Sequence, residues 1–158
     1  MSAIVIVDTS VLLNIMDVPG RNQHKAAVLD RLAALIDNED HLFIPMAAIV
    51  EVGNHNAHVG DGALRRSAAE RFVKELRGAL ADQAPWKPIN LPSNQEVLRW
   101  LDAFPDSAMR GESLADLSIQ QEWETCCTRF AMSHVWVWAL DRHLGGLDRR
   151  APRRKIQG

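Results

Sequence analysis

The chain begins with a continuous apolar run, Ala3 to Val7 (AIVIV), that ends at Asp8. A run without polar alternation is typical of a strand buried on both faces, as in the interior of a parallel sheet. Thr9 and Ser10 follow directly, and both residue types are favoured as helix N-caps, here ahead of the apolar stretch VLLNIM. The segment therefore predicts a strand, a tight turn and a helix, with a carboxylate at the carboxyl end of the strand.

Strand-like and helix-like segments alternate along the rest of the chain. Apolar residues recur at helical spacing over residues 28–36, 46–58, 64–80 and 113–130, and short β-branched or aromatic runs lie at residues 42–44 and 135–139. Residues 82–92 contain three prolines and predict a loop, with at most a short edge strand over residues 86–89. A capping box of Ser93 and Glu96 begins one further helix, and we expect residues 105–111 to form a loop after it. This alternation favours an α/β fold with a mainly parallel central sheet, in which ligands bind at the carboxyl ends of the strands.

Length and composition predict one globular domain. The 158 residues are 47% hydrophobic and 24% charged, and the net charge of −2 excludes a uniformly basic nucleic-acid binder. Five of the 18 Lys and Arg residues lie in the last ten positions, so residues 1–148 carry 13 basic groups against 20 acidic ones, a net charge of −7. We expect a body of residues 1–148 and a flexible basic tail of residues 149–158. The tail either contacts a nucleic-acid backbone or only aids solubility.

Cysteine usage and hydropathy argue against two further classes of protein. Cys126 and Cys127 are neighbours, and such a pair cannot join distant segments of a disulfide scaffold. The apolar run before Asp8 is too short for a signal peptide, and no apolar stretch approaches the roughly 18 residues of a membrane span. We expect a cytoplasmic protein without membrane contact.

Four acidic residues have positions that invite a joint interpretation. Asp8 follows the first strand and Asp141 follows the last, so both are expected at the same edge of a parallel sheet. Glu51 lies in an apolar helical stretch (AAIVEVG) and Asp116 in the first turn of its helix, with Glu112 as a substitute for Asp116. Acids among apolar residues are costly to bury unless they are paired, hydrogen-bonded or metal-bound. The alternative for each of the four is a helix cap or an exposed charge.

The chemistry of four neighbouring carboxylates favours a bound cation. Without one they would repel one another and their pKa values would rise. A divalent cation reverses that effect, and all-oxygen ligands suit Mg²⁺ or Mn²⁺. Such a site best supports metal-assisted hydrolysis of a phosphodiester bond, in which the cation activates water and steadies the leaving oxygen.

Four blocks of the sequence, IVIVDTSVLL, IPMAAIVEVGN, GESLADLSI and VWVWALDRHL, resemble the PIN domain family in that order. The resemblance implies a three-layer α/β/α fold and a Mg²⁺- or Mn²⁺-dependent endoribonuclease acting on RNA. It implies that Asp8, Asp116 and Asp141 hold the metal, that Glu51 holds metal or orients the attacking water, and that the hydroxyl of Ser10 assists. Many bacterial members are VapC-type toxins paired with an antitoxin, and many form homodimers, so an antitoxin partner and a homodimer are also expected.

Two departures from the family pattern keep other functions open. Ala139 stands where many members carry Thr or Ser, and Asp116 and Asp141 are 25 residues apart, which is long for a compact member. These features motivate the alternative of a degenerate PIN scaffold that binds RNA or a protein partner without cleavage. A metal-dependent DNA nuclease or phosphatase is a third possibility, because the same carboxylate site can act on other phosphate esters.

Two further side-chain groups have alternative interpretations. Glu51, His55 and His58 share a helix face and could form a zinc site, although their spacing is not that of a two-His metalloprotease helix. Trp136 and Trp138 point to the same side of a strand. We expect both to pack in the core, with base stacking as the alternative.

Overall fold

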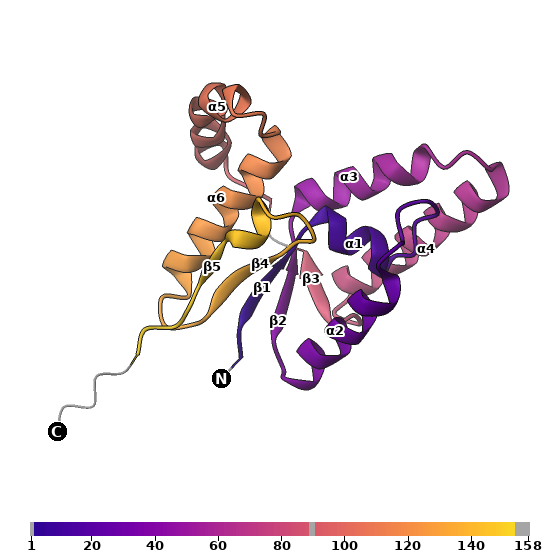
Figure 1. The fold of residues 1–158 in the computed structure, drawn as a ribbon, viewed down its shortest axis with the longest axis horizontal. Coiled ribbons are helices and arrows are strands. Elements are labelled where there is room, and N and C mark those ends of the chain that lie inside the picture. The colour runs from indigo at the N-terminus through magenta and orange to yellow at the C-terminus, as the bar shows by residue number, and fades with distance from the viewer. Residues whose placement is uncertain (1, 89–90, 154–158) are drawn as a thin grey trace.

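The computed structural model describes residues 2–88 and 91–153. Its strands form one sheet in the order β3-β2-β1-β4-β5, with β1 at the centre (Figure 1). The strand bounds are β1 Ile4–Val7, β2 His41–Ile44, β3 Trp86–Pro88, β4 Val135–Trp138 and β5 Asp148–Arg149. β1 to β4 run parallel, and β5 is antiparallel to β4. Ile89, the last residue of the expected edge strand, lies outside the described residues.

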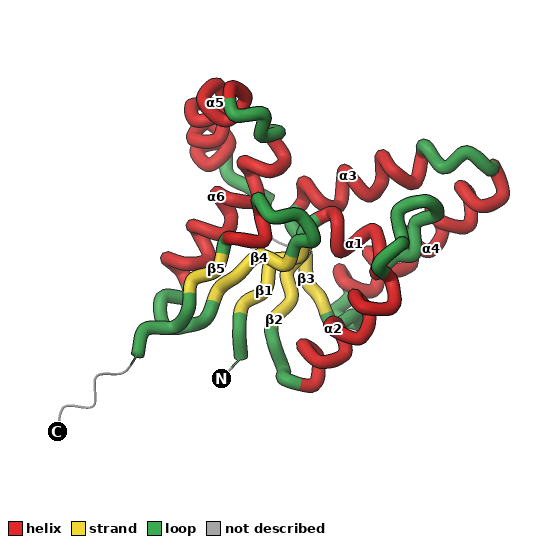
Figure 2. The backbone as a smooth tube through the Cα atoms, in the orientation of Figure 1, coloured by secondary structure: helices red, strands yellow, loops and turns green. Residues whose placement is uncertain are grey.

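Helices cover both faces of this sheet. Their bounds are α1 Thr9–Ile15, α2 Lys25–Asp37, α3 Met46–Ala57, α4 Gly62–Leu80, α5 Asn94–Met109 and α6 Leu114–Arg129, and a 3₁₀ turn, η1, spans Leu144–Gly146. The helices α1 to α4 lie on one side of the sheet, α6 lies on the other, and α5 packs against α6 (Figure 2). The expected three-layer α/β/α fold with a mainly parallel sheet is confirmed. In the part of the chain that the structure describes, no helix has the length and hydropathy needed to cross a membrane.

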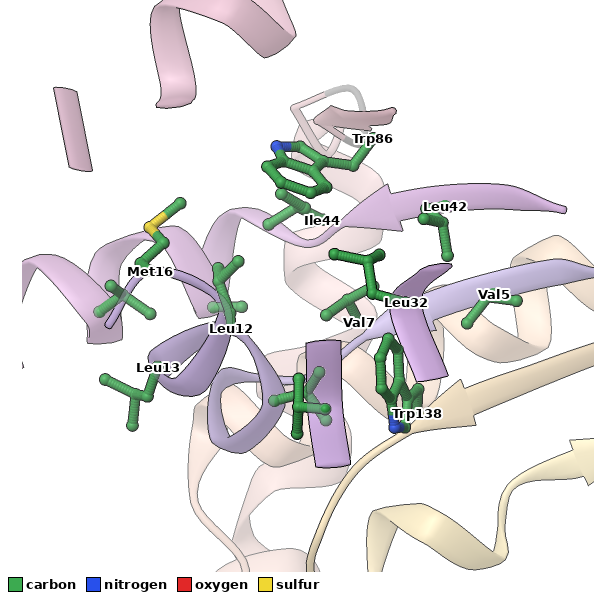
Figure 3. Packing of buried hydrophobic residues seen from close by; sticks show 14 of the residues in the cluster. Val5, Val7, Leu12, Leu13, Met16, Leu32, Leu42, Ile44, Trp86 and Trp138 are labelled. Atoms are coloured by element: carbon green, nitrogen blue, oxygen red, sulfur yellow. The ribbon is translucent and has the colours of Figure 1, made fainter. Parts of the chain in front are cut away.

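The larger hydrophobic core lies between the sheet and the helices α1 to α4. Val5 and Val7 of β1 point into it, together with side chains from α1, α2, β2 and β3 (Figure 3). Ile6 points to the opposite face, into a smaller core under α6. All four residues of β1 are buried, as the apolar opening run predicts.

The two tryptophans of β4 have different environments. Trp138 is buried in the larger core, so the prediction of core packing is confirmed for this residue. Trp136 is only half-buried: the Arg31 guanidinium lies 5.6 Å from its ring centroid, and the His134 ring stacks on it at 6.3 Å. Trp136 therefore packs against the border of the core and is not enclosed in it.

The expected loop over residues 105–111 is wrong for its first five residues, because α5 continues through Pro105 to Met109. Proline removes one helical hydrogen bond, but the turn that follows it has its own anchor. Ser107 is the buried residue of this helix, and its carbonyl accepts from the backbone N–H groups of Arg110 and Glu112. This end of the helix is thereby fixed against the segment that leads into α6.

No sequence signal predicts β5, which spans the last residue of the expected body, Asp148, and the first residue of the expected tail, Arg149. Arg149 pairs with Val135 in the sheet. Its guanidinium donates to the carbonyls of Cys127, Phe130 and Ser133 at 2.7–2.8 Å. These carbonyls end α6 and begin the turn after it, where a cation is favourable. Arg149 is thus a structural residue of the domain, and within the basic segment Arg154 and Lys155 lie outside the described residues.

We predict that Arg149→Ala lowers the free energy of unfolding by at least about 2 kcal/mol, because three carbonyls lose a charged donor. Arg150→Ala removes the same charge from an exposed neighbour and should change stability by less than about 0.5 kcal/mol. Urea denaturation of the two variants measures both values. Equal stabilities would contradict the anchoring role of Arg149.

Candidate active site at the carboxyl edge of the sheet

Asp8 lies at the junction of β1 and α1, with no residue between it and either element. It is the N-cap of α1: its extended backbone (φ −77°, ψ 161°) starts the helix, and its side chain accepts from the Ser10 backbone N–H at 3.2 Å. Thr9 and Ser10 were expected as caps, but both already belong to the first helical turn. Asp8 is the single residue between the end of β1 and the start of α1, so its side chain takes the capping role.

Ser10 fixes the position of the Asp8 carboxylate. Its hydroxyl donates to Asp8 Oδ2 at 2.7 Å and accepts from the backbone N–H of Leu140 at 3.0 Å. The backbone N–H of Asp8 also donates to the carbonyl of Trp138 at 3.0 Å. These bonds join the ends of β1 and β4, so Ser10 holds the two strand ends together at the expected site.

Asp8 is 4% exposed, and its environment disfavours the negative charge. Burial raises the pKa of Asp8 above its ordinary value of 3.8, and hydrogen bonds from Ser10 and the Thr9 backbone oppose that effect. The negative charge of Asp141 raises the pKa further. A carboxylate in this position is stabilised by a nearby cation.

Asp141 follows β4 by three residues and is held by the turn that it begins. Its Oδ1 accepts from the backbone N–H groups of His143 and Leu144, both at 2.9 Å. Its Oδ2 accepts no hydrogen bond from the described residues and is exposed with the rest of the side chain. Oδ1 therefore fixes the orientation of the Asp141 side chain, and Oδ2 is open to a ligand.

Glu51 and Asp116 lie on the helices that flank this edge. Glu51 is half-buried in the second turn of α3, which starts directly after β2 and Pro45. Asp116 is in the first turn of α6, where its backbone N–H donates to the N-cap Ser113 hydroxyl at 3.0 Å. The helices α3 and α6 contact each other. The topology thus places the four acids at one edge of the sheet.

The side chains themselves are only partly assembled. Asp8 and Asp141 influence each other directly, whereas neither Glu51 nor Asp116 makes a hydrogen bond to this pair. Among residues 2–88 and 91–153, no three His, Cys, Asp or Glu side chains form a group that could hold a metal ion as they lie. The donor set consists of carboxylate oxygens and suits a hard divalent cation in its chemistry. Of the four expected ligands, Asp8 is joined through the Ser10 hydroxyl to the backbone of Leu140, the residue before Asp141, and no three of the four form a group.

Glu112, the substitute for Asp116, has a different environment. Its carboxylate contacts Arg110 Nε at 3.0 Å and His143 Nε2 at 3.1 Å, and its side chain is 10% exposed. The pKa of Glu112 is lowered, mainly by the hydrogen bond that Arg110 donates to its carboxylate. Glu112 links the α5–α6 connection to the turn that carries Asp141. Sequence reasoning missed Arg110 and His143, although His143 lies only two residues beyond Asp141.

The histidines of α3 do not join this site. His58 is the C-cap of α3, and its Nδ1 lies 2.7 Å from the carbonyl oxygen of Asn54. Burial is the main cause that lowers the pKa of His55, and the nearby Arg21 lowers it further. A zinc group with Glu51 is not formed in the described part of the chain.

Comparison with known proteins supports the fold. No family model matches the sequence, and no curated protein matches it. Among solved structures, FitAcB from Neisseria gonorrhoeae is similar with a TM-score of 0.55 at 17% identity, over 87% of this chain and 87% of that one. VapBC2 from Rickettsia felis, bound to a DNA fragment from their promoter, gives a TM-score of 0.47 at 13% identity, over 75% and 77%. The second match is too distant to carry an argument; the first supports a PIN-like fold.

We predict that Asp8→Asn stabilises the protein at pH 7. Asparagine keeps the N-cap and removes the buried charge. Because the folded-state pKa of Asp8 is raised, the wild type loses stability as pH rises from 3.8 through that pKa, so the advantage of the variant should shrink toward pH 4.

The measurement is the melting temperature from pH 4 to pH 8. Asp30→Asn is the matched control, since Asp30 is exposed on α2 and the charge change is the same. A wild type more stable than Asp8→Asn at pH 7 would show that the Asp8 charge is favourable in the fold.

Proposed function

We propose that this protein is a divalent-metal-dependent endoribonuclease that hydrolyses phosphodiester bonds of RNA at the carboxyl edge of its sheet. The observation that carries the proposal is the placement of Asp8 and Asp141 at one edge of the sheet, where Ser10 joins Asp8 to the backbone beside Asp141; Asp8 is buried with a raised pKa, and Asp141 has a free carboxylate oxygen. Like charges are kept together at a cost, and a bound cation offsets that cost. The PIN-like fold and the four sequence blocks support the same reading.

In this proposal Asp8, Glu51, Asp116 and Asp141 hold Mg²⁺ or Mn²⁺. Bound there, the cation supplies Lewis-acid chemistry that favours attack of water on phosphorus. Ser10 keeps the Asp8 carboxylate in one orientation through its two hydrogen bonds. Preorganised ligands of this kind avoid reorganisation during the reaction. Glu51 has the second role of orienting the attacking water.

Arg149, Arg150 and Arg153, the described cations of the basic segment, contribute little at this edge. Because β5 is antiparallel to β4, Arg149 lies level with Val135, at the start of β4 and the far end from Asp141. Its guanidinium is also committed to three carbonyls. Arg150 and Arg153 are exposed and leave the domain on that far side. They would attract RNA by charge without contacting the bond that is cut.

More specifically, we assign this nuclease to the toxins of the VapC type, which an antitoxin controls, and expect it to act as a homodimer. The sequence resemblance supports this assignment, and the likeness to FitAcB supports the fold on which it depends. The helix α5 also exposes a row of apolar side chains, including Leu98 at 58% and Met109 at 87%. Exposed apolar faces of this kind are typical of surfaces that meet another protein.

A second candidate function follows from the incomplete side-chain arrangement. No three acids form a metal group in the described residues, and Ala139 offers no hydroxyl beside Asp141. A degenerate scaffold that binds RNA or a protein without cutting is consistent with both observations. Its RNA binding would be unaffected by a chelator.

We predict that the wild type cleaves a pool of structured RNAs in Mn²⁺ or Mg²⁺ and that a chelator abolishes the cleavage. Asp8→Asn and Asp116→Asn should each reduce the rate by at least about 100-fold. Loss of an outer-shell partner costs about 10–100-fold, and a direct ligand should cost more. Gel analysis of the products, with Asp30→Asn as the control that keeps wild-type activity, makes the measurement.

An active and folded Asp116→Asn protein would overturn the assignment of this acid. RNA binding without cleavage, equal with and without chelator, would favour the scaffold. Circular dichroism of each variant shows whether a loss of activity reflects a loss of fold.

A further inference from the structure

A cavity of about 430 Å³, with none of the four acids in its lining, lies between the β2–β3 side of the sheet and the helices α5 and α6. The smaller core under α6 is built around β1 and β4 and does not fill this region. The volume is within the range of small-molecule sites, which is roughly 300–1,000 Å³. The lining residues used below are Phe43, Trp100, Glu122, Arg129 and Phe130.

Glu122 is the polar group that the fold leaves unsatisfied in this cavity. Its Oε2 is buried and has no hydrogen-bond partner in the described part of the chain. Burial raises the pKa of Glu122 to about 7, and the charge of Glu96 contributes. Buried carboxyl oxygens normally find a donor. A ligand that supplies N–H donors would satisfy this oxygen.

Aromatic rings form the other walls. Phe43 of β2 and Phe130 lie with their ring centroids 6.5 Å apart, and Trp100 of α5 also lines the cavity. Flat π faces of this kind accept a planar heterocycle by stacking. Phe43 and Trp100 are both half-buried, so part of each side chain is open to a ligand.

A positively charged side chain, that of Arg129, lies at the exposed side of the same cavity. The Arg129 guanidinium is 5.2 Å from the centroid of Phe130 and has no ion-pair partner among the described residues. The other lining cation, Lys87, is already 3.2 Å from Asp82. An unpaired guanidinium beside an aromatic ring suits a phosphate group.

We propose that this cavity binds one nucleotide, with its base stacked on the aromatic walls, its Watson–Crick edge donating to Glu122 and its phosphate at Arg129. Guanine fits best, because its N1–H and N2–H groups are adjacent donors that match the two oxygens of an ionised carboxylate. Adenine and cytosine place a ring acceptor beside their amino group, and uracil offers a single N–H between two carbonyls. Recognition of an unstacked base by such an edge is a common mode of single-strand binding.

The position of the cavity is consistent with a nucleic-acid ligand. Glu122 and Asp116 lie on the same helix, six residues apart, which is about 9 Å along the axis. Nucleotide binding here requires neither a metal ion nor cleavage. Nucleotide binding at this cavity can therefore be tested independently of RNA cleavage.

The test is isothermal titration of the full chain at pH 8 with GMP, AMP, CMP and UMP, without a divalent cation. We expect GMP to bind at least tenfold more tightly than the other three nucleotides. Glu122→Gln should weaken GMP at least tenfold, and it should fold, since it removes a buried charge. Glu124→Gln, an exposed acid two residues along α6, should bind as the wild type does.

Two further variants separate the parts of the site. Arg129→Gln should weaken GMP while leaving the affinity for guanosine unchanged, which identifies the phosphate contact. Asp8→Asn should bind GMP as the wild type does, which separates the cavity from the four acids. Absence of GMP binding to the folded wild type, equal affinity for all four nucleotides, or unchanged affinity in Glu122→Gln would each overturn the proposal.

Discussion

Burial of β1 on both faces is the constraint on which the candidate active site depends. Ile4 to Val7 are each 3% exposed or less, so the strand can only lie at the centre of the sheet. The chain then changes to a helix at one residue, and that residue is Asp8. An ionisable group is thereby held at the carboxyl edge of the sheet, where the end of β4 and the starts of α3 and α6 also lie. The Ser10 hydroxyl completes this arrangement by joining Asp8 to the backbone after β4.

The carboxyl groups of Asp8 and Glu122 are largely removed from water, although a charged group is more stable when hydrated. Asp8 and Glu122 both have raised pKa values, and in both cases burial is the largest cause. Asp8 has a neighbour of like charge, and Glu122 has an oxygen without a donor. Local rules are usually broken where a protein has a function. The two proposals assign one ligand to each: a divalent cation at Asp8 and a nucleobase at Glu122.

Much of the fold was predictable because its signals are local. The unbroken apolar run of β1, the Ser93–Glu96 capping box and the N-cap at Ser113 each specify structure within a few residues. The edge on which Asp8 and Asp141 meet followed from parallel topology alone. That Asp8 caps α1 was only the alternative interpretation of this residue, beside Thr9 and Ser10 as expected caps, because the sequence does not show that the connection between β1 and α1 has a single residue.

What the sequence could not show depends on contacts between distant segments. Arg149 looked like the start of a basic tail, yet its partners are carbonyls 16 to 22 residues earlier. Pro105 looked like a helix end, yet Ser107 anchors another turn. The contact of His143 with Glu112 joins the turn after β4 to the α5–α6 connection, and the cavity at Glu122 follows from how α5 and α6 pack. Neither has a sequence pattern of its own.

The most direct measurement is a crystal structure of the wild type soaked in Mn²⁺, with anomalous data collected at the manganese edge. A bound ion is expected as a peak in contact with Asp8 and Asp141, with Glu51 or Asp116 turned toward it. The same soak of Asp8→Asn should show no peak at that place. An empty edge in the wild type at a saturating Mn²⁺ concentration, or an equal peak in the variant, would contradict a metal-dependent site built on Asp8.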